Sequence, residues 1–439
     1  MFRIQSCIRP MSACFVLMLS LCPALAQADD LSAAEQRIVA AVKERREGAL
    51  QLLERSVNIN SGTMNHDGVR AVGAVFRDEF DQLGFRTKWV DMPTDMQRAG
   101  HLVAEHKGNQ GKRLLLIGHL DTVFEKDSPV QAWNRVGDKV YGQGVSDMKG
   151  GNVIIIEALR ALKKIGALEN TQIQVVFSGD EESVGSPTSV ARADLINAAK
   201  RSDFALAFEG NVRNKDGLDT GTIGRRASGG FTLEVKGNQG HSAGVFGNIG
   251  FGAIYETARI LNSFREQLIE PDLTFNAGIV LGGTDVSYDE LANKGNAFGK
   301  GNIIPRTTIV KSDMRYLSAE QRDRTIERMR AIVAKNLPGT SATISFRESY
   351  PPMAPTEGNL KLLEIYSKAS KDAGLGVIPA LAPGLRGAGD IQFVAPIIDS
   401  LDGLGAAGSG AHSPAEALEI ASIERAAIRT AILLYRLTR

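Results

Sequence analysis

The sequence predicts an α/β fold, in which a sheet flanked by helices is interrupted by a smaller α+β unit. Short apolar runs alternate with helical patterns through residues 113–208, an order typical of a parallel sheet covered by helices. From about residue 225 the order changes to β-α-β-β-α-β, the pattern of a ferredoxin-like unit. The length of 439 residues also exceeds what one core usually holds, so we expect two domains.

The larger domain is expected to contain residues 27–224 and 351–439. The apolar run at residues 114–117 has no polar alternation, which indicates a strand buried on both faces. Ligands bind at the carboxyl edge of such sheets, so the residues that follow the strands are candidates for function. The expected elements are a helix at 31–57, a strand at 113–117, a helix at 152–163, strands at 172–177 and 204–208, and helices at 360–373 and 416–437.

The smaller domain is expected at residues 225–350, as an insertion in the larger one. Residues 231–235 alternate apolar and polar side chains, as a half-buried strand does, and residues 319–335 form a charged helical pattern. The expected elements are strands at 231–235, 273–280, 302–316 and 341–348, and helices at 251–266 and 319–335.

The first 26 residues have the features of a secretory signal. Arg3 and Arg9 precede an apolar run at residues 11–22, and Ala24-Leu25-Ala26 is a small-x-small cleavage pattern. We therefore expect a cleaved signal peptide and a periplasmic or secreted protein; a lipoprotein signal through Cys22 is a weaker alternative. The run is shorter than the roughly 20 residues that span a membrane, and no later run is comparable, so no membrane span is expected.

Composition limits both the metal chemistry and the partners. All three cysteines, Cys7, Cys14 and Cys22, lie in the leader, so a metal in the mature chain must be held by histidine and carboxylate. The 51 basic and 50 acidic residues nearly balance, which gives no argument for nucleic acid or anionic lipid. Small solutes are the expected partners.

Histidine, acid and glycine gather where an expected strand ends or a helix begins. His119 and Asp121 follow the strand at 113–117 two residues apart, so an extended chain would turn both side chains to one face. Asp121 is close enough to fix the tautomer of His119. Asp147 lies in a glycine-rich segment just before a helix, where backbone can approach a ligand. Taken singly, a polar strand end or a helix-capping aspartate would also explain these residues.

Three further acids and one histidine complete the set. Glu181 and Glu182 follow the strand at 172–177, and adjacent side chains cannot point at one spot, so we expect one ligand and one base. Glu209 ends the strand at 204–208, and His412 lies in a loop before the last helix. A solvated loop would explain any one of these alone. All of them lie on the same expected rim, and imidazole with carboxylate suits catalytic zinc.

In combination these motifs resemble those of the M20 metallopeptidases, above all the bacterial glutamate carboxypeptidases, over nearly the whole chain after residue 26. The resemblance implies a zinc-exopeptidase-type mixed sheet and an inserted ferredoxin-like dimerisation, or lid, domain. It also implies two Zn²⁺ ions, although the same ligand types accept Co²⁺ or Mn²⁺. The implied metal ligands are His119, Asp147, Glu182, Glu209 and His412.

The resemblance also implies a role for each side chain. Asp147 would bridge two zinc ions, and the peptide bond to Met148 would be cis. His119 and Glu209 would complete one metal site, and Glu182 and His412 the other. Glu181 would be the general base that takes a proton from water and passes it to the leaving amine. Asp121 is counted with the catalytic residues.

Four residues outside this rim match family positions in the substrate pocket. His241 would reach across a homodimer and stabilise the developing oxyanion, although a loop histidine is the simpler alternative. Asn302 and Arg315 would hold the carboxylate of the substrate, which suits a bidentate guanidinium, although Arg315 could also form a salt bridge. Gly387 would line the same pocket through backbone groups.

The predicted function is a secreted di-zinc carboxypeptidase that releases a C-terminal amino acid, above all glutamate, from peptides or N-acyl conjugates such as folates. An N-acyl-amino-acid deacylase of the same family would have the same ligands, and Glu at position 209 suits both activities. A non-catalytic metal-binding scaffold is the third hypothesis, which Glu181 beside a full ligand set disfavours. His66, His101 and His106 lack acidic neighbours in the sequence and are interpreted as surface or structural residues.

Overall fold

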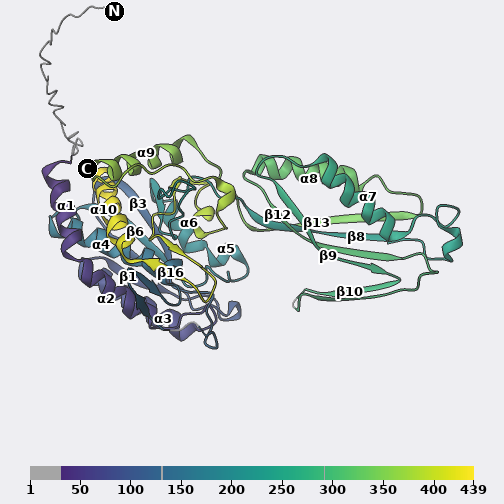
Figure 1. Ribbon diagram of the computed structural model, residues 1–439, viewed down its shortest axis with the longest axis horizontal. Coiled ribbons are helices and arrows are strands. Elements are labelled where there is room, and N and C mark those ends of the chain that lie inside the picture. The colour runs from purple at the N-terminus through teal and green to yellow at the C-terminus, as the bar shows by residue number, and fades with distance from the viewer. Residues whose placement is uncertain (1–30, 130–131, 291) are drawn as a thin grey trace, which may run out of the picture.

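The protein consists of a larger and a smaller α/β unit that lie side by side (Figure 1). The structure is a computed structural model that describes residues 31–129, 132–290 and 292–439, so the predicted leader lies outside the described residues. Within these residues, no helix combines the length and the apolar character that crossing a membrane requires.

The larger unit is built on a six-stranded mixed sheet in the order β1-β2-β6-β3-β7-β14. Strand β3 pairs in parallel with β6 and β7, and β7 pairs in parallel with β14. Strands β1 and β2 add an antiparallel edge. The strands are β1 (Arg86–Val90), β2 (His101–His106), β3 (Gln110–His119), β6 (Thr171–Ser178), β7 (Phe204–Ala207) and β14 (Asp399–Leu401).

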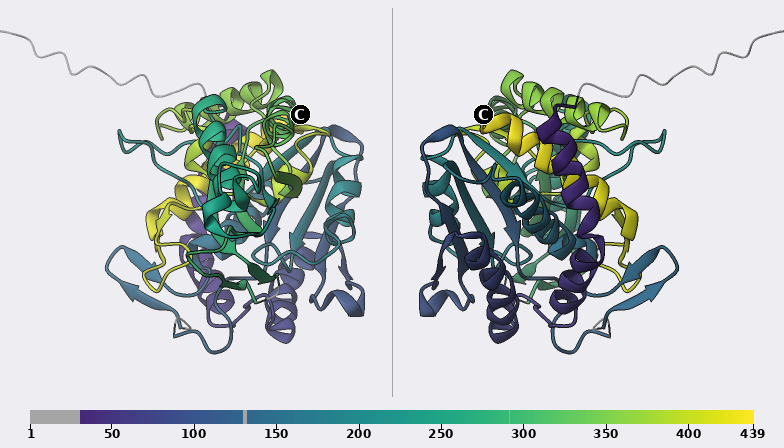
Figure 2. Two further views of the ribbon diagram at one scale, coloured as in Figure 1. Left: turned by 90° about the vertical axis from the view of Figure 1, so that its right-hand side faces the viewer. Right: turned by 90° about the vertical axis from the view of Figure 1, so that its left-hand side faces the viewer.

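Helices cover both faces of this sheet because alternate side chains of its central strands point to opposite sides. Leu114 and Leu116 join one hydrophobic cluster, and Leu115 and Ile117 join another. Helices α1 and α10 lie side by side on the outside of the first cluster (Figure 2). The helices are α1 (Ala33–Glu44), α2 (Arg46–Val57), α3 (His66–Leu83), α4 (Gly150–Lys164), α5 (Thr188–Ala191), α6 (Ala193–Ala199), α9 (Glu357–Asp372) and α10 (Ile420–Leu437).

The smaller unit is a four-stranded antiparallel sheet in the order β13-β8-β12-β9, with two helices on one face. Phe231, Leu233 and Val235 alternate along β8 and pack with Ile260 and Phe264 of α7 in a hydrophobic core separate from that of the larger unit. The elements are β8 (Ser228–Gly237), α7 (Gly252–Gln267), β9 (Thr274–Gly283), β12 (Thr307–Arg315), α8 (Ala319–Val333) and β13 (Thr340–Tyr350).

Several elements differ from the sequence prediction. The helix expected at 31–57 is two helices that meet at Arg45, whose backbone (φ −96°, ψ 2°) leaves the helical range and whose side chain reaches Glu157 of α4 at 3.4 Å. The strand expected at 302–316 begins only at Thr307, after Pro305, which has no amide hydrogen for a ladder. The last helix begins at Ile420 rather than at residue 416.

Two small β structures have no counterpart in the prediction. A hairpin of β10 (Asp285–Asp289) and β11 (Lys294–Phe298) follows β9 in the smaller unit. A second four-stranded sheet, in the order β15-β16-β5-β4, lies on the larger unit and carries the loop of His412 between β15 and β16. Its strands are β4 (Asn134–Val136), β5 (Lys139–Tyr141), β15 (Gly408–Ser409) and β16 (Ala417–Glu419).

Candidate metal centre

The carboxyl ends of three neighbouring parallel strands bring most of the predicted ligands to one edge of the sheet. His119 is the last residue of β3, Glu182 follows β6, and Glu209 follows β7. Asp147 directly precedes α4, whose start lies close to the end of β7 because residue 151 is a glycine. A Cβ atom at Gly151 would lie 2.0 Å from the carbonyl oxygen of Phe208, so no other residue fits there without a shift.

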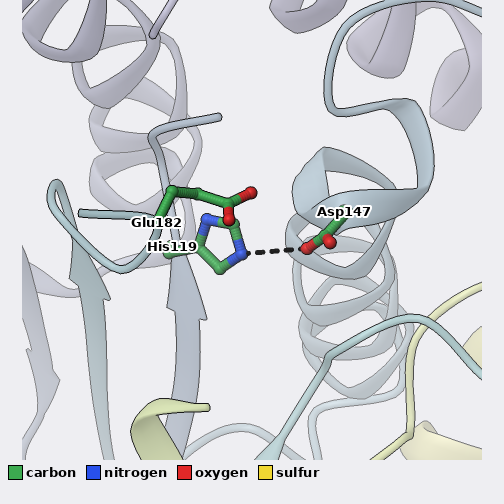
Figure 3. A group of neighbouring side chains, drawn as sticks. All are labelled: His119, Asp147 and Glu182. Atoms are coloured by element: carbon green, nitrogen blue, oxygen red, sulfur yellow. Dashed lines mark hydrogen bonds and ion pairs between the residues drawn. The ribbon is translucent and has the colours of Figure 1, made fainter. Parts of the chain in front are cut away.

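The two carboxylate oxygens of Asp147 face two different histidines. His119 Nε2 lies 3.2 Å from Asp147 Oδ1, an interaction that Figure 3 shows across the gap between β3 and α4. The same nitrogen lies 3.6 Å from Glu209 Oε1. His412 Nε2 lies 3.2 Å from Asp147 Oδ2 and 3.1 Å from Glu182 Oε2. The five predicted ligands thus form two groups that share Asp147.

These separations fit the coordination shell of a metal ion. Ligand atoms about 2.1 Å from a tetrahedral zinc ion lie about 3.4 Å from one another. The ligand atoms of His119, Asp147 and Glu182 also lie within 4.8 Å of one another, as do those of His119, Glu181 and Glu209. Oxygen Oε1 of Glu182 is buried and has no hydrogen-bond partner among the described residues, so a cation would satisfy it.

The electrostatics of the group show an excess of buried negative charge. Burial and the neighbouring Asp147 raise the pKa of Glu209 to about 7. Burial likewise raises the pKa of Glu181 and Glu182. Hydrogen bonds to Asp147 and Glu182 raise the pKa of His412 to about 11. The glutamate carboxyl groups have raised pKa values because they are buried close together, and the imidazoles between them also have raised pKa values. Both effects show that the site strongly favours positive charge.

Asp121 connects the two halves of the rim. Its carboxylate accepts hydrogen bonds from the backbone N–H groups of Glu181 and Glu182, at 3.0 and 3.1 Å, and from Thr63 Oγ1 at 2.6 Å. Nδ1 of His119 donates to the carbonyl oxygen of Asp121 at 3.0 Å. That bond fixes the tautomer of His119 and leaves Nε2 free to bind a metal. Asp121 therefore orients His119 and the backbone that carries Glu181 and Glu182.

Glu416 holds the segment that carries Asp147, and no feature of its sequence neighbours predicts this role. Its buried carboxylate accepts hydrogen bonds from the backbone N–H groups of Gly144, Ser146 and Asp147, at 3.0, 2.8 and 3.0 Å. The peptide bond between Asp147 and Met148 is cis, as the resemblance predicts. Glu416 thus fixes the backbone from which the shared carboxylate projects.

A buried charge network behind Glu181 also escaped the sequence prediction. Arg192, which is fully buried, donates from Nη1 to Asp180 Oδ1 and from Nε to Asp390 Oδ1, each at 2.6 Å. Tyr350, the last residue of β13, donates from its hydroxyl to the carbonyl oxygen of Glu181 at 2.9 Å. Arg192 therefore links the turn after β6 to the loop at residue 390.

Replacing Arg192 with leucine is expected to lower the free energy of unfolding by about 3 to 5 kcal/mol, because two buried carboxylates would lose their charge partner. Urea denaturation would measure the change. The control is Arg201→Leu, which removes an exposed guanidinium bonded to Gln174 and should cost less than about 1 kcal/mol. Equal costs for the two variants would show that the network does not stabilise the fold.

His101 corrects one detail of the prediction. It is a buried structural residue, but acids do surround it: its Nε2 lies 3.3 Å from Asp180 Oδ1, and its Nδ1 lies 3.9 Å from Asp194 Oδ2. Both acids come from elements distant in the sequence, so neighbouring residues could not reveal them. His66 and His106 each bond a backbone carbonyl oxygen instead.

The four predicted pocket residues fall into two separate places. Ser242 N donates to Asn302 O at 3.0 Å, and His241 forms a β-bridge with Ile303, so His241 and Asn302 lie together. Arg315 is at the other end of β12, about 26 Å from Thr307 at the usual rise per residue. Gly387 lies in the larger unit, where its carbonyl oxygen accepts a hydrogen bond from Arg225. Only Arg315 and Gly387 adjoin the junction of the two units.

The chain is similar to known peptidases over most of its length. Residues 115–435 match the peptidase family M20/M25/M40. Carboxypeptidase G2 from Pseudomonas sp. (strain RS-16) is 31% identical over 392 residues, which cover 88% of this chain and 88% of that protein. Succinyl-diaminopimelate desuccinylase from Aromatoleum aromaticum is 25% identical over 356 residues, which cover 78% of this chain and 85% of that protein.

A solved structure has the same fold. The aminopeptidase PepT from Bacillus cereus ATCC 10987 aligns with a TM-score of 0.69 and 16% identity, over 90% of this chain and 99% of that chain. Identity at this level supports the fold alone.

Proposed function

The chain belongs to peptidase family M20/M25/M40, and on this premise we propose that it is a di-zinc carboxypeptidase that releases a C-terminal amino acid, above all glutamate. One observation supports the two-metal site most directly. The two oxygens of Asp147 each lie 3.2 Å from a different histidine, and each histidine is paired with its own glutamate. A carboxylate in that position can bridge two cations.

The chemistry follows from the chain's own groups around the proposed metals. Bound zinc would lower the pKa of a water molecule and polarise the scissile carbonyl of the substrate. Glu181 has no part in the two groups that share Asp147, but it lies within 4.8 Å of His119 and Glu209. Burial raises its pKa well above the usual range of a glutamate, which strengthens its carboxylate as a proton acceptor. Glu181 would move the proton from the attacking water to the leaving amine.

The smaller unit would act as a lid in a homodimer. His241 follows β8 and Asn302 precedes β12, so both lie at the Thr307 end of β12, opposite the end at Arg315 that adjoins the junction. The smaller unit extends away from the larger one (Figure 1), so a second copy of the chain could present these residues to the metal centre. Apolar side chains are exposed on the same unit, where Phe246 is 58% and Tyr255 52% exposed with ring centroids 5.1 Å apart. Exposed aromatic residues of this kind favour an interface.

A mixture of His241→Ala and Arg315→Ala proteins is expected to recover about a quarter of wild-type activity after subunit exchange, although each variant alone is nearly inactive. Half of the dimers would be mixed, and each would contain one site with both residues intact. Steady-state assays of the mixture over a range of ratios would measure the recovery. No recovery, with exchange shown by mass spectrometry, would mean that both residues act on one chain's own site.

Two classes of substrate fit the proposed metal centre. Relatives include both a carboxypeptidase and a desuccinylase, so an N-acyl-amino-acid deacylase is the second candidate. We propose secretion through the leader at residues 1–26, which suits scavenging of nutrients.

Zinc-loaded mature protein should release glutamate from N-acyl and peptidyl glutamates, folate among them, and a chelator should abolish the reaction. Activity confined to short acetyl or succinyl amino acids would favour the deacylase, and no turnover would favour the scaffold.

A further inference from the structure

Three arginines with buried side chains lie around the candidate metal centre, and two of them are paired with carboxylates. Arg192 is paired with Asp180 and Asp390, as described above. Arg225 donates from Nε to Asp402 Oδ2 at 2.7 Å and from Nη1 to the carbonyl oxygens of Gly387 and Ala388. Each of these guanidinium groups thus has a carboxylate within hydrogen-bond distance, as burial of a charge requires.

Arg386 is different, because no carboxylate of residues 31–129, 132–290 or 292–439 lies within hydrogen-bond distance of its guanidinium. Its side chain is 9% exposed, and its one hydrogen bond in the described part of the chain runs from Nη1 to the carbonyl oxygen of Gly210, at 2.8 Å. Nε is buried without a partner. The closest carboxylate oxygen is Glu209 Oε2, at 4.0 Å from Nη2. A buried guanidinium left in this state is costly unless a ligand supplies the missing acceptors.

The guanidinium of Arg386, which has no carboxylate partner at hydrogen-bond distance among the described residues, lies beside the candidate metal centre. Glu209 faces His119 with Oε1 and Arg386 with Oε2, so the guanidinium borders the candidate ligands. Arg386 also directly precedes Gly387, in the loop that Arg225 holds. The planar fork of a guanidinium binds a carboxylate through two parallel hydrogen bonds, which neither a neutral amide nor an apolar group can accept equally well.

We propose that Arg386 is a specificity-determining residue that binds the side-chain carboxylate of an acidic C-terminal residue of the substrate. This inference rests on the proposed carboxypeptidase function, in which Arg315 binds the α-carboxylate. A second carboxylate on the same residue then needs a second cationic partner, and Arg386 has N–H groups to spare. The enzyme would therefore prefer C-terminal glutamate or aspartate over their amides.

The test compares Arg386→Gln with wild-type enzyme on two substrates that differ only in N-acyl-glutamate versus N-acyl-glutamine. For wild type we expect kcat/KM to favour glutamate, and for the variant we expect this ratio to fall by roughly 100-fold, mainly through slower turnover of the glutamate substrate. Arg386→Lys should keep part of the preference. The control is Arg213→Gln, which removes a guanidinium paired with Asp219 and Glu419 outside the rim and should leave the ratio unchanged.

Two outcomes would overturn the role of Arg386. Equal losses on both substrates would assign it to the α-carboxylate or to the fold, and loss of zinc from Arg386→Gln, measured by elemental analysis, would assign it to the support of Glu209. An unchanged ratio in an active variant would also contradict it while leaving the carboxypeptidase proposal intact. Wild-type protein that releases neither amino acid would instead overturn the carboxypeptidase proposal and this inference together.

Discussion

Replacing Glu181 with alanine is expected to lower kcat by about 10³-fold while the protein keeps its full metal content. General acid–base catalysis by a positioned side chain is worth roughly 10² to 10⁴ in rate. Unlike Glu182 and Glu209, Glu181 lies outside the two groups that share Asp147. KM should change little, because the proposed pocket for the substrate carboxylate consists of other residues. Steady-state kinetics and elemental analysis of the same preparation would measure both quantities.

The neighbouring glutamate provides a matched control for that experiment. Glu182→Ala removes the same chemical group one residue later, but from a side chain whose Oε2 lies 3.1 Å from His412. We expect this variant to lose one of the two proposed metals as well as its activity. If Glu181→Ala loses metal and Glu182→Ala keeps it, the roles of base and ligand are reversed.

The sequence was sufficient to predict the rim because the relevant information is local. His119, Glu182 and Glu209 each follow an apolar strand, and parallel strands bring such residues to one edge whatever the loops between them do. The observed order of strands confirms the expected α/β sheet, with an antiparallel edge at β1 and β2. The match to peptidase family M20/M25/M40 confirms the family that these motifs resemble.

The supporting residues could not be predicted because their partners are far apart in the chain. Glu416 bonds the backbone of Asp147 across 269 residues, and Arg192 bonds Asp390 across 198. Nothing in the sequence next to either residue differs from an ordinary surface charge. The burial that makes them important arises only when the loops pack together.

The helix break at Arg45 and the surroundings of Arg386 could not be predicted from the sequence for a related reason. The chain next to Arg45 has neither a proline nor an adjacent glycine, and both α1 and α2 pack against α4. Arg386 likewise stands in a loop, and nothing in its sequence neighbours indicates that its side chain would be buried. Its unpaired N–H groups become visible once the partners of Arg192 and Arg225 are known.

Asp147→Ala is expected to abolish binding of both metals and to lower kcat/KM by about 10³-fold or more, since metal ions supply several kcal/mol of transition-state stabilisation. Removing His119 or His412 should weaken one site much more than the other, because each imidazole contacts one oxygen of Asp147. Elemental analysis and calorimetric titration with zinc would count the sites in each variant.

The variant Glu416→Gln distinguishes the loss of the ligand Asp147 from the loss of the hydrogen bonds that hold the Asp147 segment in place. The amide can still accept hydrogen bonds from some of the backbone N–H groups of the Asp147 segment, but it lacks the charge and the second equivalent oxygen. We therefore expect weaker zinc binding, by roughly 10 to 100-fold, that excess zinc restores together with activity. Excess zinc should not restore zinc binding or activity to Asp147→Ala. An Asp147→Ala protein that binds one zinc ion with unchanged affinity would show that Asp147 serves a single metal site.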